Sequence, residues 1–557
     1  MDNNQNEMNV NAKEANPVER PKEESWKAAF AENAEFATAN GATVNTGTPF
    51  SVPTGTAWKS RREDTEALQK MKEKFSFFGP ATLAYAVFYA FCMFQNDAGI
   101  AFLFFIIATQ AYLCVALRQL DMKLKKGSAF YLTAMLLLAV STFCTDDAGI
   151  IIFNKTGIFL LAISLLLKNF YQTNEWGLGK YLQSILLSGV GCLEELERPF
   201  TDTAEHMKKG GKDGKNLGYV LLGLVISFPV LAVVIGLLAD ADVFFRQIAY
   251  DVVDVINAES IVWVMSRILL VFLFTYILIA RLCRHSLSES VTDHRNGEPV
   301  LAITVTGLLT LVYLLFSGIQ IFGLFLGQMQ LPQGYTYAEY AREGFFQLLA
   351  VSIINLVLVL SVMSFFKESK VLKGILTLMS LCTFVMIASS VMRMLMYIQN
   401  YDLTYLRILV LWTLGLLTFL FVGVLISIYS RKFPMFRYSM VVVTILYLGL
   451  SFGHPDYLIA SVNVRKQTVD YKYLERLSAD AAPVLIPYIQ QSGTVKIYRE
   501  EDGKVWFDST GDSPKRTAPI SFGLGYLDKL VEEKMDSGIR TFNVSRYIAA
   551  EQCRGFE

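Results

Sequence analysis

The stretch that decides the fold is Val300–Gly327, VLAITVTGLLTLVYLLFSGIQIFGLFLG, which runs for 28 residues without a charged side chain. A helix rises about 1.5 Å per residue, so roughly 20 such residues cross a hydrocarbon core of about 30 Å. The whole chain shares this character, since 53% of its residues are hydrophobic and only 18% are charged. This composition indicates a membrane protein, because soluble globular chains carry about 25% charged residues.

Ten further apolar segments accompany this stretch. The sequence therefore predicts an all-α polytopic membrane protein with about eleven transmembrane helices. The fourth segment is the weakest, because Asn154 and Lys155 interrupt its apolar run. The predicted spans, in chain order, are Phe75–Phe94, Ala98–Leu117, Ser128–Thr145, Ile150–Leu167, Tyr219–Ala239, Ile261–Ala280, Val300–Gly327, Phe345–Phe366, Gly374–Met392, Ile408–Tyr429 and Tyr438–Phe452.

Basic residues in the loops fall on alternate sides of these spans. One side carries 26 lysines and arginines near the spans, and the other carries 5. Short basic loops stay in the cytoplasm, so we expect a cytoplasmic N-terminus and an extracytoplasmic C-terminus. Omitting the fourth span would invert every later loop and destroy this asymmetry, which is why we retain it.

Polar segments at both ends divide the chain into three predicted regions. Residues 1–57 are rich in Asn, Ala, Glu and Thr without an apolar period, so we expect a disordered cytoplasmic tail. Residues 58–452 form the transmembrane domain. Residues 453–557 are polar enough for a small folded domain, which the expected topology places outside the membrane.

Residues 168–217 form a long loop on the predicted cytoplasmic side. Apolar residues at helical spacing in this loop predict a helix that lies in the membrane interface. A soluble packing helix is the alternative. The apolar face consists of Tyr181, Leu182, Ile185, Leu186 and Val190, and Trp176 precedes it.

The C-terminal region has the pattern of a small α+β extracytoplasmic domain. Residues 494–508 alternate apolar and polar side chains around Asp502-Gly503, which predicts a hairpin with a type I′ turn. Asp480 is positioned to cap a helix running towards Gln491, and Ser521–Met535 predicts a second helix.

Motifs for catalysis or metal binding are missing from the sequence. The seven cysteines contain no C-x-x-C pair, and the four histidines are scattered without metal-ligand spacing. We therefore predict no catalytic residue, no metal, no cofactor and no nucleic-acid partner. The expected partners are the lipid bilayer and an envelope protein, and the ligand stays unknown.

Charged residues at the outer ends of the predicted helices suggest a ligand-binding site. Arg267 lies six residues into its span and needs a partner or a path to the surface. We expect it to pair with Asp240 or Asp242, at the adjacent end of the neighbouring helix. Arginines at helix ends often only reach the surface with their long side chains, which is the alternative for each arginine. The hypothetical site, roofed by residues 453–557, consists of Asp240, Asp242, Arg267, Arg342 and Arg407.

Six short segments resemble a family of bacterial multi-pass membrane proteins, known as domain of unknown function 4153/4173. The resemblance extends over roughly residues 75–557 and implies a protein of the bacterial cytoplasmic membrane, without a known activity or catalytic residue. One departure is Ala460-Ser461-Val462-Asn463, where the family has an Arg-aromatic pair before the Asn. The segments that carry the resemblance are Ala239–Phe244, Tyr340–Phe346, Tyr401–Arg407, His454–Ala460, Tyr473–Ala481 and Phe542–Arg546.

Three functions remain open at this point. The leading hypothesis is ligand binding or envelope sensing at the outer face, with coupling to transport as an added hypothesis. The first alternative is a membrane-embedded transferase that acts on lipid-linked substrates through outer aspartates. The second is a structural or assembly partner in the cell envelope. The outer aspartates are Asp97, Asp146, Asp147, Asp240 and Asp242.

Overall fold

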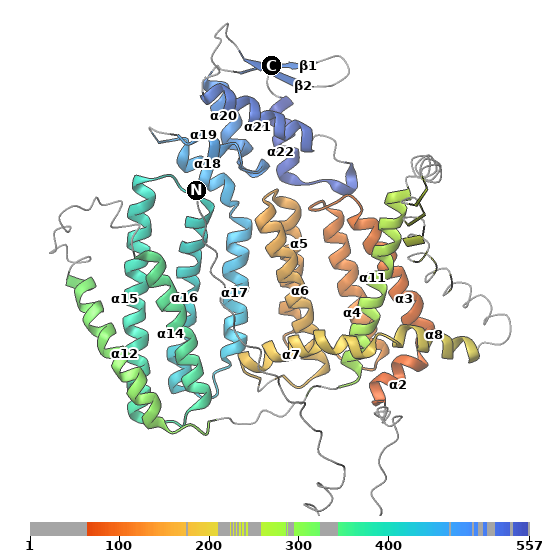
Figure 1. The fold of residues 1–557 in the computed structure, drawn as a ribbon, viewed down its shortest axis with the longest axis horizontal. Coiled ribbons are helices and arrows are strands. Elements are labelled where there is room, and N and C mark those ends of the chain that lie inside the picture. Colours follow the sequence, from red (N-terminus) through yellow and green to blue (C-terminus); the bar gives the residue numbers. More distant parts are fainter. Residues whose placement is uncertain are drawn as a thin grey trace, which may run out of the picture. The chain divides into compact units, whose positions relative to one another are not determined.

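The computed structural model describes most of the chain from Asp64 onward, and these residues belong to one compact unit, Asp64–Glu557. The predicted tail, residues 1–57, lies outside the described residues. Figure 1 shows the fold. The described ranges leave gaps at 174–175, 210–222, 224–226, 228–229, 231–232, 235–236, 239–240, 243–257, 286, 288–294, 323–343, 467–468, 493–494, 500–504, 510–517, 535–537 and 555–557.

Nine helices within the described ranges are long and apolar enough to cross a membrane, by length and composition. A further apolar helix, α5 (Ser128–Cys144), has 17 residues. These helices indicate an integral membrane protein. The nine are α3 (Phe75–Met93), α4 (Ala101–Gln119), α6 (Ala148–Phe170), α11 (Ala258–Cys283), α12 (Pro299–Gln320), α14 (Phe345–Phe365), α15 (Lys370–Asn400), α16 (Tyr405–Tyr429) and α17 (Met435–Phe452).

The predicted number of eleven spans is not established by these helices. The predicted fifth span, Tyr219–Ala239, lies largely outside the described residues, so it stays a prediction. The fourth span, by contrast, is present as α6. Its N-terminus is fixed by Asp147, whose side chain accepts hydrogen bonds from the backbone N–H groups of Gly149 and Ile150.

The membrane helices form two groups with separate apolar cores. One core joins α3, α4, α5, α6 and α11, and the other joins α12, α14, α15 and α16. Helix α17 packs against both α5 and α16, and it therefore links the two groups. In the second group, the Tyr313 hydroxyl donates to Asn355, and the Asn355 amide donates to Thr383. These bonds connect three helices, which is the usual task of buried polar groups in membranes.

Short helices cover the end of the bundle that lies opposite the C-terminal segment. They are α2 (Glu66–Glu73), α7 (Leu178–Gly191), η1 (Cys192–Glu195) and α8 (Arg198–Lys209). Figure 1 shows α7 lying across the long helices. Its Tyr181 is buried, whereas Leu186 is 70% exposed and Val190 is 66% exposed. An apolar helix face with this exposure suits the membrane interface, as the sequence predicts.

An ion-pair cluster fastens these short helices to α11. The carboxylate of Glu195 is fully buried and lies 3.1 Å from Arg198 Nε and 2.9 Å from Arg284 Nε. The neighbouring pair of Glu194 and Arg281 is more open, since the Glu194 side chain is 53% exposed. Because the Glu195 carboxylate is buried, removing either of its arginine partners should destabilise the fold more than breaking the exposed pair.

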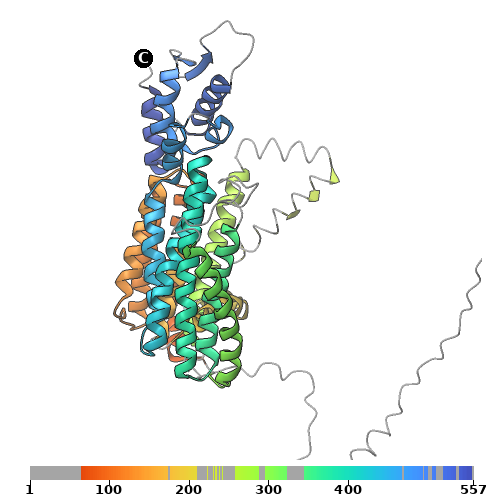
Figure 2. The same ribbon diagram turned by 90° about the vertical axis from the view of Figure 1, so that its left-hand side faces the viewer.

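Residues 453–557, which we call the C-terminal segment, follow α17 and lie beyond one end of the long helices (Figure 2). Strands β1 and β2 pair antiparallel, so the two predicted strands are present, whereas the predicted type I′ turn lies outside the described residues and stays a prediction. The predicted second helix is present as α21. The elements are α18 (Pro455–Asn463), α19 (Tyr471–Leu474), η3 (Ala479–Ala481), α20 (Ala482–Ser492), β1 (Val495–Arg499), β2 (Val505–Ser509), α21 (Ala518–Lys534), η4 (Ile539–Thr541) and α22 (Val544–Arg554).

Candidate functional site

The five residues of the predicted site are only partly described. Asp240 and Arg342 lie outside the described residues, and Asp242 is at the edge of one described range. The Arg267 guanidinium lies 5.0 Å from the centre of the Trp263 ring, and that of Arg407 lies 4.2 Å from the centre of the Tyr397 ring. These contacts are to aromatic rings, so the expected pairing of Arg267 with an aspartate, and the grouping of all five residues, stay predictions.

The structure brings a different set of charged residues together, where the C-terminal segment meets the turn between α5 and α6. Four carboxyl groups, each at most 8% exposed, lie here with one histidine and one arginine. Water is largely excluded from this place, so each charge needs a protein partner. We call this set the outer acidic network, and it consists of Asp146, Asp147, His454, Asp456, Asp480 and Arg546.

Asp480 is the central acceptor of the network. Its Oδ1 accepts the backbone N–H of Asp146 at 2.7 Å, and its Oδ2 accepts the Thr145 hydroxyl and lies 2.9 Å from Nδ1 of His454. Burial opposes ionisation of Asp480, but the hydrogen bonds from His454 and Thr145 outweigh it and lower the carboxyl pKa. The same hydrogen bond to Asp480 raises the pKa of His454. These opposite shifts stabilise an ion pair.

This geometry corrects the sequence-based role of Asp480. The residue lies inside η3, directly before α20, as the predicted position required. However, its carboxylate bonds to the α5–α6 turn and to His454, so the prediction that it caps the following helix is wrong. A capping residue bonds to backbone N–H groups of its own first turn. Contacts with the distant turn satisfy this carboxylate instead.

The Asp146 side chain, in the α5–α6 turn, bonds to the C-terminal segment. Its Oδ1 lies 2.8 Å from Nε of Arg546, and its Oδ2 accepts the backbone N–H of Ala479 at 3.2 Å. The buried amide of Asn543 adds two bonds, to the carbonyl oxygens of Ala98 at 3.0 Å and Thr145 at 2.8 Å. The C-terminal segment is therefore fastened to two turns of the membrane domain.

Asp147 is the incompletely bonded member of the network. Its Oδ1 accepts the N–H groups of Gly149 and Ile150, but its buried Oδ2 has no hydrogen-bond partner among the described residues. The buried hydroxyl of Tyr405 likewise makes no complete hydrogen bond within the described ranges, but it lies close enough to the Asp147 carboxyl group to interact with it. A Cβ added to Gly149 would lie 2.9 Å from that hydroxyl and 3.1 Å from Asp147 Oδ1. Glycine therefore leaves room for the phenol beside the carboxylate.

The electrostatic surroundings favour a proton on Asp147. Burial, followed by the nearby charge of Asp456, raises the pKa of Asp147 to about 6. Burial also raises the pKa of Asp456, although its Oδ2 accepts the N–H of Ser478 at 2.8 Å. Two carboxyl groups that share a buried place resist ionising together.

Polar contacts continue from the network into the membrane helices. The amide oxygen of Asn154, a fully buried residue, accepts the hydroxyls of Tyr447 and Ser451, each at 2.8 Å. Ser451 in turn lies 2.6 Å from the Ser141 hydroxyl. Asn154 follows Asp147 by seven residues, so it lies about 10 Å further along α6. The residue that weakens the apolar run of the fourth span is thus the centre of a buried polar cluster.

Other chemistry is less well supported by the described residues. Within them, no group of three or more His, Cys, Asp and Glu side chains is arranged to hold a metal ion.

Sequence reasoning named Asp146 and Asp147 only as outer aspartates of the transferase alternative. The signal that pointed to the network was the family-like segments, because His454, Asp480 and Arg546 all lie in them.

Comparison with known proteins places this arrangement in a family. A family model described as "Domain of unknown function (DUF4153)" matches residues 132–488. The chain belongs to this family. The match is shorter than the resemblance seen in the sequence, and the DUF4153 region includes every network residue except Arg546. Neither the curated proteins nor the solved structures provide a match.

Proposed function

We propose that the protein senses conditions at the extracytoplasmic face of a bacterial membrane by taking up a proton at Asp147. One observation carries this proposal: the Asp147 carboxyl group and the Tyr405 hydroxyl lie beside the same glycine and act on each other, and the buried Asp147 Oδ2 has no complete hydrogen bond within the described ranges. A protonated carboxyl gains a donor that the carboxylate lacks, and the phenol oxygen is able to accept it.

The charges around Asp147 support proton uptake. Positive charge in the network is already engaged, because Arg546 pairs with Asp146 and His454 pairs with Asp480. The groups that face Asp147 from the elements packed around it are two carboxyls and three phenols, namely Asp456, Asp480, Tyr405, Tyr447 and Tyr473. A proton on Asp147 removes negative charge that none of these groups compensates.

The position of the network supports a link between proton uptake and docking of the C-terminal segment. Asp147 belongs to the α5–α6 turn, whereas Asp456 and Asp480 belong to the C-terminal segment. Repulsion between Asp147 and Asp456 acts across the contact between these two parts, and protonation relieves it. We infer that the C-terminal segment docks more firmly when Asp147 is protonated.

Orientation is part of the proposal. The asymmetry of 26 basic residues against 5 supports an extracytoplasmic C-terminal segment and a cytoplasmic N-terminus. The buried polar cluster at Asn154 offers a route by which docking changes reach the membrane helices. Coupling to transport is a separate hypothesis. The transferase alternative has less support, because both Asp146 and Asp480 have their carboxylate oxygens bonded within the network.

The experiment that tests the proposal is amide hydrogen exchange of residues 478–492 in the purified full-length protein, corrected for intrinsic pH dependence. We expect protection to fall as pH rises from 5 to 8, with a midpoint near the Asp147 pKa of about 6. Asp147→Asn retains a capping side chain but cannot ionise. It should lose the midpoint near pH 6 and keep only the loss of protection that His454 contributes at higher pH. An unchanged pH profile in this variant would refute the proposal.

A matched pair of tyrosine variants separates sensing from stability. Tyr405→Phe removes the proposed acceptor of the Asp147 proton, so it should shift the midpoint of the exchange profile while changing thermal stability little at pH 8, where Asp147 is ionised. The Tyr473 hydroxyl accepts the backbone N–H of Tyr405 at 2.9 Å. Tyr473→Phe should therefore reduce stability by about 1 kcal/mol without removing the pH dependence. The reverse outcome for the two variants would contradict the assigned role of Tyr405.

A further inference from the structure

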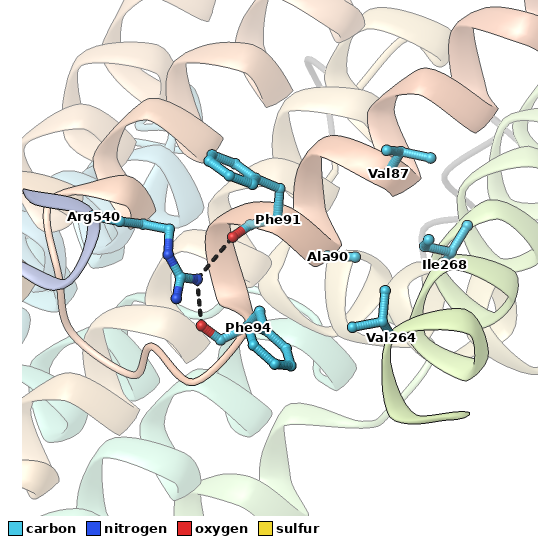
Figure 3. Close-up of a pocket in the computed structure, with 7 residues that line it drawn as sticks. All are labelled: Val87, Ala90, Phe91, Phe94, Val264, Ile268 and Arg540. Carbon is cyan, nitrogen blue, oxygen red and sulfur yellow. Dashed lines mark hydrogen bonds between the residues drawn. The ribbon is translucent and has the colours of Figure 1, made fainter. Parts of the chain in front are cut away.

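An apolar groove of about 450 Å³ lies between α3 and α11, next to the C-terminal segment (Figure 3). Its walls are aliphatic and aromatic, and one side chain at its edge is charged, that of Arg540. The groove is open to the surroundings of the bundle, since the Phe91 side chain is 64% exposed and that of Val87 is 48% exposed. The lining residues are Val87, Ala90, Phe91, Phe94, Val264, Ile268 and Arg540.

The groove continues along α3 towards the middle of the membrane. A second apolar hollow, of about 720 Å³, shares Val87 and Phe91 with the first and extends to Leu83 and Pro80. Pro80 and Phe94 are fourteen residues apart, which corresponds to about 21 Å along a helix. One leaflet of hydrocarbon is about 15 Å thick. The combined surface is therefore long enough for an extended acyl chain.

Arg540 is held at the outer end of this surface. Its Nη1 donates to the carbonyl oxygen of Phe91 at 2.9 Å and also to that of Phe94. These carbonyls belong to the last turn of α3, whose negative end attracts the guanidinium. The hydrogen bonds shown for Arg540 both use Nη1, and Figure 3 shows the guanidinium at the end of the helix, beside the Phe94 carbonyl. This position corresponds to the level of lipid phosphates, where arginine is well suited to bind.

We propose that this groove is a binding site for an anionic phospholipid, with one acyl chain along α3 and the phosphate at Arg540. Two features on the molecule favour a lipid over a protein partner. The walls belong to two membrane-spanning helices, so lipid already surrounds them. The single positive charge lies at the end of the apolar surface, which matches an amphiphile with one anionic head.

The test is native mass spectrometry of the detergent-purified full-length protein with phosphatidylglycerol or with phosphatidylcholine of identical acyl chains. Both lipids carry the phosphate, but only phosphatidylcholine adds a trimethylammonium charge that the Arg540 guanidinium repels, so we expect wild type to retain one phosphatidylglycerol about tenfold more strongly than phosphatidylcholine. Arg540→Gln should abolish this preference, and Arg540→Lys should keep part of it. Arg554→Gln serves as the control, because Arg554 is 60% exposed on the far helix α22.

Further variants keep the proposal falsifiable if Arg540→Gln folds poorly. Val87→Trp fills the groove without touching Arg540, and it should reduce retention of both lipids. Retention of phosphatidylglycerol by Val87→Trp at the wild-type level would overturn the proposal, as would equal retention of the two lipids by wild type. A double variant, Val87→Cys with Val234→Cys, tests whether protein occupies the groove instead of lipid. Val234 belongs to the predicted fifth span, Tyr219–Ala239. A disulfide that forms rapidly within one chain of the double variant would show that the predicted fifth span fills the groove. A disulfide that forms rapidly between two copies of the Val87→Cys variant would show that a second copy fills it, and either result would overturn the proposal.

Discussion

The carboxylate of Asp480 accepts the backbone N–H of Asp146 at 2.7 Å, although 334 positions separate the two residues. The contact is reciprocal, because the Asp146 carboxylate accepts the N–H of the neighbouring Ala479. Charged acceptors make stronger hydrogen bonds than neutral ones, and both of these are buried. The C-terminal segment is therefore held to the membrane domain in a single defined register.

The first prediction concerns the charge of Asp480. Asp480→Asn keeps the shape of the side chain but removes its charge, which leaves His454 without an anionic partner. We expect the free energy of docking to fall by about 3 kcal/mol, as for a broken buried pair. Hydrogen exchange of α20 and α22 measures this loss. Glu551→Gln is the control, since its pair with Arg554 is exposed and should contribute less than about 1 kcal/mol. Equal effects of the two variants would argue against the network.

The second prediction is the pH dependence of stability. Asp147 and Asp456 have raised pKa values in the folded state, so the folded protein binds protons that the unfolded chain has lost, and stability falls as pH rises from about 4 through about 6. His454 also has a raised pKa, so its contribution is complete below pH 6.5 and is lost above its folded pKa. Asp480 acts in the opposite sense, because its contribution is lost only as pH falls below 3.8. Thermal unfolding midpoints should therefore be highest at about pH 4 and should fall as pH rises through about 6. A midpoint that rises steadily from pH 5 to pH 8 would be inconsistent with these assignments.

The third prediction tests orientation. Cys553 is unsuitable as a reporter, because it is 1% exposed and burial raises the pKa of its thiol to about 11. Ile539 is 93% exposed, so Ile539→Cys provides an accessible thiol in the C-terminal segment. In intact cells, a membrane-impermeant maleimide should label this variant. Lys126→Cys, in the exposed loop after α4 at the other end of the bundle, should react only after lysis. The opposite labelling pattern would invert the proposed topology.

The fourth prediction contrasts two adjacent glutamates. The Glu195 carboxylate is fully buried between Arg198 and Arg284, whereas Glu194 is 53% exposed beside Arg281. Glu195→Gln should lower the free energy of unfolding by about 3 kcal/mol, because it leaves the largely buried Arg284 without its carboxylate partner and Arg198 with Asp64 alone. Glu194→Gln should change it by less than about 1 kcal/mol. Thermal unfolding in detergent measures both, and similar losses would show that burial does not distinguish the two pairs.

Local sequence patterns were sufficient for most of the membrane helices. Hydropathy alone locates α12 and α14, because an uncharged apolar run of this length has few alternatives. The fourth span needed a second argument, the alternation of loop charge, since Asn154 lowers its hydropathy. The structure explains the exception in part, because Tyr447 and Ser451 of α17 both donate to the amide oxygen of Asn154. The periodicity of residues 181–190 likewise predicted α7.

Local sequence patterns could not predict the outer acidic network. Its bonds join residues that are hundreds of positions apart, and no local periodicity records which turn meets which helix. Asp480 illustrates this limit, since its position before a helix is typical of a cap while its oxygens bond to the α5–α6 turn.

The separation of Asp146 and Asp480 along the chain also has a consequence for synthesis. Translation completes α5 and α6 long before residues 479–543 exist, so the backbone N–H of Asp146 and the carbonyl of Thr145 must wait for their partners. During that interval only solvent satisfies them. A chain that stops before Ala479 would hold its membrane helices but keep this turn open. Residues 479–543 thus complete contacts that the earlier part of the chain leaves open when it is made first.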